Sequence, residues 1–184
     1  MKRSKFAIVM HTATFVSAVL TIVFTCLHFC TEHGFWFPLA ITCGTTFYHF
    51  GMRLLVGSLV PNRFCWQSKW FRSFPWEQKL YKRLGLKTWK RTIPSYNPTL
   101  FSMKDYSLEQ IIAHMCQAEV VHEIIVVCSF LPIFFSLVVG DFPVFLITSL
   151  LAAGFDLIFV LLQRFNRPRL VRILLTKERS SGNV

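Results

Sequence analysis

The sequence predicts an all-α integral membrane protein with four transmembrane helices and a cytoplasmic loop that is both amphipathic and rich in basic and aromatic residues. Of its 184 residues, 53% are hydrophobic and 16% are charged, and phenylalanine alone contributes 20. Four apolar stretches are long enough to cross about 30 Å of hydrocarbon, which takes about 20 helical residues. We predict one membrane domain over residues 1–184, with spans at about 6–30, 35–60, 120–140 and 142–162, a loop at 61–118 and a tail at 163–184.

The distribution of positive charge predicts the orientation of these spans. Ten Lys and Arg residues lie in the central loop and six lie in the tail, whereas the two short connections contain none. Because Lys and Arg favour the cytoplasmic side, we expect both termini and the loop to be cytoplasmic. The net charge of +11 then belongs to one face of the bilayer, where it favours anionic lipid and not nucleic acid as a partner.

The six cysteines predict neither a disulfide framework nor a metal site. They are scattered along the chain without any Cys-x-x-Cys spacing, and four of them lie in apolar segments. Structural zinc sites and disulfide-rich domains need closely spaced cysteines, so we expect no bound metal.

The central loop contains a predicted amphipathic helix from Pro75 to Leu84. Proline in the first turn and Gly85 after the last turn are typical helix boundaries. The spacing places Trp76, Leu80, Tyr81 and Leu84 on one side, and Glu77, Lys79, Lys82 and Arg83 on the other. Such a helix is expected to lie in the membrane interface.

A second helix is predicted to start at Ser107, because Ser107 and Gln110 have the spacing of a capping box. Helical periodicity continues from there into the third span without proline or glycine. This helix carries Glu119 and His122, which are three residues apart and therefore lie on one face within side-chain contact.

Glu119 and His122 allow three interpretations. In the first, they are interfacial polar groups that pair with loop lysines. In the second, they are half of a di-iron carboxylate site, which needs further acids from other helices. The interpretation we prefer makes His122 a general base that Glu119 orients, as acyl transfer to a hydroxyl requires.

Polar residues within other spans predict a polar cavity. His49 and Arg53 are one turn apart in the second span, and Asp156 and Gln163 are seven residues apart in the fourth. Arg53 could instead extend to the interface, but Asp156 lies deeper and should have a partner such as Arg53 or His49.

The last span runs directly into Gln163-Arg164-Phe165-Asn166-Arg167-Pro168-Arg169-Leu170. Positive charge alone would serve to fix topology. The arginines, however, are accompanied by two amides and a proline, and arginine is suited to bidentate capture of phosphate or carboxylate. We therefore interpret this segment as a candidate clamp at the membrane surface.

Three stretches resemble the glycosyl-4,4'-diaponeurosporenoate acyltransferases. Met115-Cys116-Gln117-Ala118-Glu119-Val120-Val121-His122 is similar to their acidic–histidine helix, the segment Gln163–Leu170 to their C-terminal signature, and the segment Leu86–Pro94 to a motif in their hydrophilic loop. The resemblance covers roughly Trp76 to Leu174. It implies a small bacterial cell-membrane enzyme that esterifies a sugar hydroxyl of a glycosylated carotenoid acid with a fatty acyl chain, the last step of staphyloxanthin synthesis.

With this resemblance, the residues predict acyl transfer from a thioester, either acyl-coenzyme A or an acyl carrier, to a membrane glycolipid. The thioester is a co-substrate, and no bound cofactor is expected. His122 would accept the hydroxyl proton, Asn166 or Trp89 would donate to the oxyanion, and Arg164, Arg167, Arg169 and Lys90 would hold the donor's phosphates. Direct transfer is the simpler expectation, with an acyl-enzyme at Cys116 as the other. The alternative function is a non-catalytic membrane scaffold or anionic-lipid-binding protein.

Overall fold

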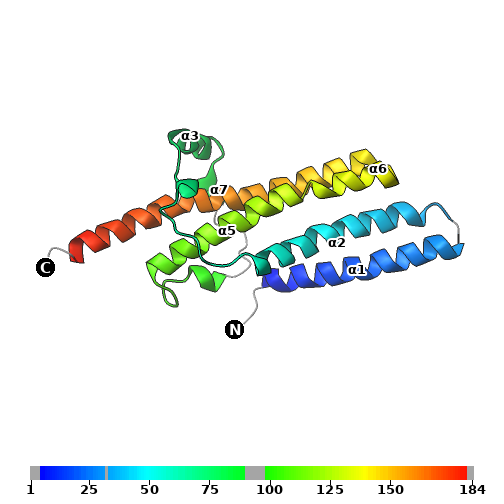
Figure 1. Cartoon of the computed structure of the whole chain (residues 1–184), viewed down its shortest axis with the longest axis horizontal. Coiled ribbons are helices and arrows are strands. Elements are labelled where there is room, and N and C mark those ends of the chain that lie inside the picture. Colours follow the sequence, from blue (N-terminus) through cyan, green and yellow to red (C-terminus); the bar gives the residue numbers. More distant parts are fainter. Residues whose placement is uncertain (1–4, 32, 90–97, 182–184) are drawn as a thin grey trace. The chain divides into compact units, whose positions relative to one another are not determined.

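The computed structural model describes residues 5–31, 33–89 and 98–181, and all regular structure in these ranges is helical (Figure 1). The all-α prediction is therefore confirmed for this part of the chain. The elements are α1 (Lys5–Thr31), α2 (Trp36–Leu59), η1 (Lys69–Phe71), α3 (Pro75–Arg83), α4 (Leu86–Trp89), η2 (Pro98–Phe101), α5 (Leu108–Cys128), η3 (Leu131–Phe135), α6 (Ser136–Val139) and α7 (Phe142–Ser181).

Among the described residues, three helical segments are long and apolar enough to cross a membrane. They are Lys5–Thr31, Leu108–Val139 and Phe142–Ser180. The fourth predicted span corresponds to α2, whose 24 residues include Thr, Gly, Tyr, His and Arg among the apolar ones. Because α2 is not one of these three segments, the count of four spans stays a prediction. The cytoplasmic side of the loop also stays a prediction.

The chain forms two compact units. The first contains Met1–Leu59 with Ile125–Gly154, and the second contains Val60–Ile124 with Phe155–Val184. The helices α5 and α7 each contribute residues to both units.

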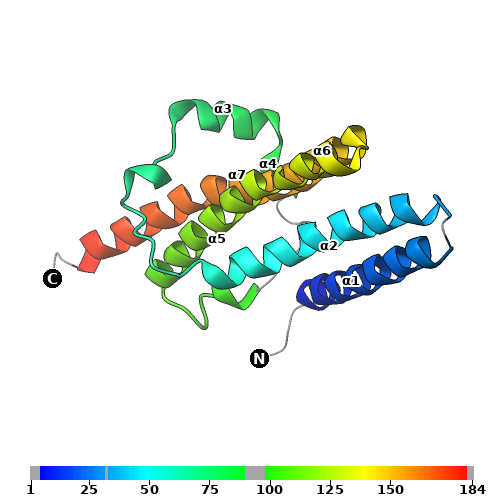
Figure 2. The same cartoon turned by 45° about the vertical axis from the view of Figure 1, so that its right-hand side comes forward.

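In the first unit, α1 and α2 run side by side as a helical hairpin, visible in blue and cyan in both views (Figures 1 and 2). Gly44 of α2 faces Thr21 of α1, where an added Cβ would be in ordinary van der Waals contact with the Thr21 methyl group at 3.5 Å. The hydroxyls of Thr14, Ser17, Thr21 and Thr25 donate to carbonyls one turn earlier in α1. These bonds satisfy the polar groups within the helix, as an apolar environment requires.

A tight turn joins α6 to α7 in the same unit. Gly140 and Asp141 both adopt positive φ, at 82° and 54°, which allows the chain to reverse over two residues. The Tyr48 hydroxyl donates to the Cys128 carbonyl at 2.8 Å and so connects α2 to the end of α5.

In the second unit, local sequence signals define the helix starts as predicted. The Ser107 amide donates to Gln110 Oε1 at 2.9 Å, and the Gln110 amide donates to Ser107 Oγ at 3.2 Å, which is a complete capping box at the start of α5. At α3, Pro75 occupies the first turn and Gly85 follows with a φ of 63°. These boundaries agree with the predicted amphipathic helix.

The helix α7 is much longer than a single span. Its 40 residues extend about 60 Å, roughly twice the thickness of the hydrocarbon core. The predicted tail is thus helical as far as Ser181, and Pro168 lies inside the helix without ending it. The residues of the C-terminal signature therefore all lie on the helical C-terminal part of α7.

Candidate functional site

The second unit brings His122 of α5 and Asp156 of α7 into direct contact. His122 Nδ1 lies 2.8 Å from Asp156 Oδ1, and the Asp156 side chain is 1% exposed. An ionised carboxylate can only accept, so in a neutral histidine ring Nδ1 would donate to it and Nε2 would be the acceptor nitrogen. The ring also stacks on Phe159, with centroids 4.7 Å apart and an angle of 10° between the planes. This is the arrangement of an oriented general base.

Glu119 does not orient His122, which corrects the sequence-based expectation. Its carboxylate accepts from Arg164 Nη1 at 2.9 Å and from Arg167 Nη1, and its side chain is fully buried. Glu119 and His122 share a helical turn, but each has a partner on α7. The orienting carboxylate of the histidine is therefore Asp156, whose predicted pairing with Arg53 or His49 stays a prediction.

The same contacts correct the clamp role expected for Arg164 and Arg167. The side chain of Arg167 is 2% exposed and that of Arg164 is 14% exposed. Besides Glu119, Arg164 pairs with Glu77 Oε1 of α3 at 2.7 Å. With their charges matched by two buried carboxylates, these guanidiniums are not available to a donor's phosphate in this arrangement.

Glu77 is a member of this network that the sequence placed on the polar, outward side of its helix. It is instead 2% exposed, while Trp76 and Leu84 of the expected apolar side are 59% and 40% exposed. The Tyr81 hydroxyl donates to Glu77 Oε2 at 2.8 Å. Burial, together with this bond to Glu77, raises the pKa of Tyr81 well above its usual range. The i,i+4 spacing of Glu77 and Tyr81 could have signalled that they share a face.

The two arginines also fasten the segment around η1. Arg164 Nη2 donates to the Arg72 carbonyl at 2.9 Å, and Arg167 Nη2 donates to the Phe71 carbonyl at 2.8 Å. The Trp70 indole donates to Glu123 Oε2 of α5 at 2.8 Å. Side chains from α5 and α7 thus hold a loop that precedes them by many residues in the sequence.

Two amides of the C-terminal signature lie near Phe159 around the circumference of α7. Gln163 and Asn166 follow Phe159 by four and seven residues, so at about 100° per residue they are within about 40° of the ring that stacks on His122. Arg169 lies about 80° from it, is exposed, and places its guanidinium 4.6 Å from the centroid of the Phe165 ring. We call Phe159, Gln163 and Asn166 the His122 face of α7.

Other predicted site residues are not brought to this face by the described contacts. Trp89 ends α4, and Lys90 lies outside the described residues. His49 is buried in the first unit, and Arg53 donates there to the carbonyls of His49 and Ala152. The predicted cavity that would join them to Asp156 and Gln163 stays a prediction.

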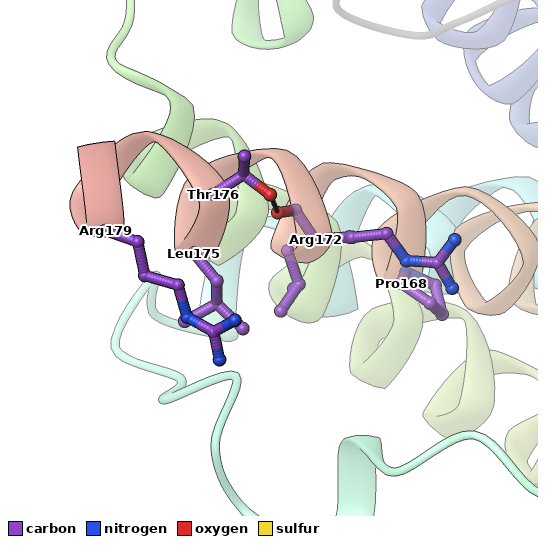
Figure 3. A pocket seen from close by; sticks show the side chains of 6 residues that line it. Pro168, Arg172, Leu175, Thr176 and Arg179 are labelled. Carbon is purple, nitrogen blue, oxygen red and sulfur yellow. Dashed lines mark hydrogen bonds between the residues drawn. The ribbon is translucent and has the colours of Figure 1, made fainter.

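A hollow of about 280 Å³ lies on the C-terminal part of α7, lined by Pro168, Val171, Arg172, Leu175, Thr176 and Arg179. Figure 3 shows these side chains along one stripe of the helix, with the Thr176 hydroxyl bonded to the Arg172 carbonyl at 2.9 Å. Leu175 follows Phe159 by 16 residues and so lies about 160° around the helix from it. The hollow is therefore on the side of α7 opposite the His122 face.

The comparisons with known proteins identify the family. The family model of glycosyl-4,4'-diaponeurosporenoate acyltransferase matches residues 67–176, which is more than half of the chain and includes Glu77, Glu119, His122, Asp156 and the whole C-terminal signature. Neither a curated protein nor a solved structure matches the chain. Since the matched range contains the segment from η1 through most of α7, the chain belongs to the glycosyl-4,4'-diaponeurosporenoate acyltransferase family and is an acyltransferase.

Proposed function

We propose that this protein transfers a fatty acyl group from a thioester donor to a hydroxyl of a membrane glycolipid, with His122 as the general base. The observation that carries the proposal is the bond between His122 Nδ1 and the buried Asp156 carboxylate in a chain of this acyltransferase family. This bond leaves Nε2 as the proton acceptor, and 23% of the histidine side chain stays exposed. Asp156 acts as a positioning residue that stabilises the imidazolium when it forms.

The proposed reaction is a direct transfer. Nε2 of His122 takes the proton of the acceptor hydroxyl while the oxygen forms a bond to the thioester carbonyl carbon, giving a tetrahedral oxyanion. The oxyanion then collapses, the carbon–sulfur bond breaks, and the leaving thiolate takes the proton back from His122. Cys116 is unsuited to an acyl-enzyme route because its residue is fully buried.

The His122 face supplies groups for the other parts of the reaction. The amides of Gln163 and Asn166 are partly exposed and carry N–H donors that an oxyanion or a sugar hydroxyl could accept. Arg169, the exposed arginine of the signature, is our candidate for the donor's phosphates, with Trp89 and Lys90 as possible loop contributors. The donor would be acyl-coenzyme A or an acyl carrier, and the acceptor a glycosylated carotenoid or a similar glycolipid.

A membrane setting suits such an acceptor. In the part of the chain that the structure describes, three helical segments are long and apolar enough to cross a bilayer, and a glycolipid would reach the site from within the same membrane. We expect a multi-pass protein of a bacterial cell membrane with its termini on the cytoplasmic side, where thioester donors are found.

The test uses membranes that contain the wild type, His122→Ala or Asp156→Asn. They receive labelled long-chain acyl-coenzyme A and a total lipid extract, and new acylated glycolipids are identified by mass spectrometry. We expect His122→Ala to lose at least about 10²-fold in product formation, the usual contribution of a general base. His114→Ala on the same helix is the matched control and should retain activity. Equal product from the wild type and His122→Ala would refute the role of His122.

A further inference from the structure

We infer that the buried ionic network of Glu77, Tyr81, Glu119, Arg164 and Arg167 is the device that positions His122 against Asp156. This inference rests on the proposed function, and it assigns Glu77 and Tyr81 of α3 as positioning residues. The network contains two carboxylates and two guanidiniums, so its charges sum to zero. Its contacts join the three helices α3, α5 and α7 and the segment η1.

The network and the His122–Asp156 pair connect the same two helices, α5 and α7. On α5, Glu119 and His122 are three residues apart, or about 4.5 Å along the axis. On α7, Asp156 and Arg167 are eleven residues apart, which at about 100° per residue returns to within about 20° of the same side. The bonds Glu119–Arg167 and His122–Asp156 are therefore two successive connections between the same two helices.

Without the network, the rotation of α5 about its own axis would depend mainly on apolar contacts. The hydrophobic effect itself is non-directional, so a directed bond between two helices constrains their rotation in a way that burial of apolar surface alone does not. Turning α5 by about 10° moves an atom at about 6 Å from its axis by about 1 Å. A misplacement of this size can cost about 10²-fold in rate. The bond between Glu119 and Arg167, one turn from His122, prevents this rotation.

Glu77 and Tyr81 belong to the network through their contacts with Arg164 and with each other. Arg164 uses Nε and Nη2 to bond Glu77 Oε1, at 3.2 and 2.7 Å, and Nη1 to bond Glu119. Tyr81 occupies the other oxygen of Glu77, at 2.8 Å. The phenol ring of Tyr81 packs edge-on against Phe165, next to Arg164 in the sequence, with centroids 5.6 Å apart. Glu77 and Tyr81 therefore determine how the Arg164 guanidinium is presented to Glu119.

The experiment is a double-mutant cycle between Glu119→Gln and Asp156→Asn. Wild-type and variant protein in membranes are assayed with long-chain acyl-coenzyme A and total lipid extract, and kcat and the donor KM are measured. We expect Glu119→Gln alone to lower kcat by about 10²-fold with little change in donor KM. In the Asp156→Asn background it should cost no more than about threefold, because the histidine has already lost its orienting partner.

Matched variants keep this test decisive. Glu109→Gln, an exposed acid in the first turn of α5, should leave kcat unchanged. If Glu119→Gln does not fold, the same cycle is run with Glu77→Gln, and Tyr81→Phe provides a milder change that should lower kcat several-fold. Losses that simply multiply in the double variant, or a raised donor KM at unchanged kcat, would overturn the positioning role. A difference between the wild type and His122→Ala in the same assay shows that the proposed function stands independently of this outcome.

Discussion

Replacing Arg167 by lysine separates a structural role from a donor-binding role, because the two roles predict different measurements. Lysine keeps the positive charge and can still pair with Glu119, but it lacks the second arm of the guanidinium. That arm donates to the Phe71 carbonyl at 2.8 Å, and the guanidinium carbon lies 4.9 Å from the centroid of the Phe71 ring. We therefore expect Arg167→Lys to destabilise the fold and to leave the donor KM unchanged.

The size of the expected loss in stability follows from the buried polar groups that lose their hydrogen-bond or ion-pair partners. A buried carbonyl without a donor costs about 1–3 kcal/mol, and this is the main effect of Arg167→Lys. For a chain of this size, that corresponds to roughly 2–4 °C in midpoint for each kcal/mol. Arg167→Met should cost more, about 3–5 kcal/mol, because it removes one side of a buried ion pair. The double variant Glu119→Leu, Arg167→Met should recover part of this loss, since it removes both charges together.

Thermal and chemical unfolding of detergent-solubilised protein measures these differences, and initial rates at varied acyl-coenzyme A measure the donor KM. Arg172→Lys is the control, because Arg172 is exposed on the same helix. A donor KM that rises tenfold or more in Arg167→Lys, with an unchanged unfolding midpoint, would refute the structural role and return Arg167 to the phosphate clamp.

Two further predictions concern residues outside the α5–α7 seam. Because burial and Glu77 raise the pKa of Tyr81 above its unfolded value of about 10, the stability it contributes is complete below pH 10 and is lost as the pH rises further. Chemical unfolding from pH 8 to 11 should therefore show a smaller alkaline loss of stability in Tyr81→Phe than in the wild type, and parallel curves would contradict this. Ser107→Ala removes the hydroxyl of the α5 capping box and should cost about 1 kcal/mol without a change in donor KM. An unchanged unfolding midpoint would show that this cap does not limit stability.

The features that the sequence predicted correctly depend on neighbours along the chain. The capping box at Ser107 needs only Gln110, and the boundaries of α3 need only Pro75 and Gly85. Membrane-spanning character likewise follows from the local average of hydropathy, which is why three of the four predicted spans are found as apolar helices of sufficient length. The α2 segment differs because polar residues are interspersed in it.

The features that were predicted incorrectly depend on partners distant in sequence. Glu119 and His122 have the spacing of a helical pair, but each finds a stronger partner on α7, at separations of 45 or 48 and of 34 residues. Glu77 looked like a solvent-facing acid because the positive charge that pairs with it when it is buried, Arg164, lies 87 residues later in the sequence. Periodicity describes which residues share a face, and it cannot tell which face is covered or by what.

The buried ion pairs of Arg164 and Arg167 change the meaning of the positive charge in the C-terminal signature. Gln163 and Asn166 belong to the His122 face, while Arg164 and Arg167 are neutralised by Glu77 and Glu119. Two of the six positive charges in the predicted tail are thus balanced within the protein. The predicted attraction to anionic lipid then depends on the other four. Because Lys could supply that attraction equally well, topology does not explain arginine at positions 164 and 167. Arginine at these positions is explained by the several directed bonds that each side chain donates, because a guanidinium offers five donors in a fixed plane.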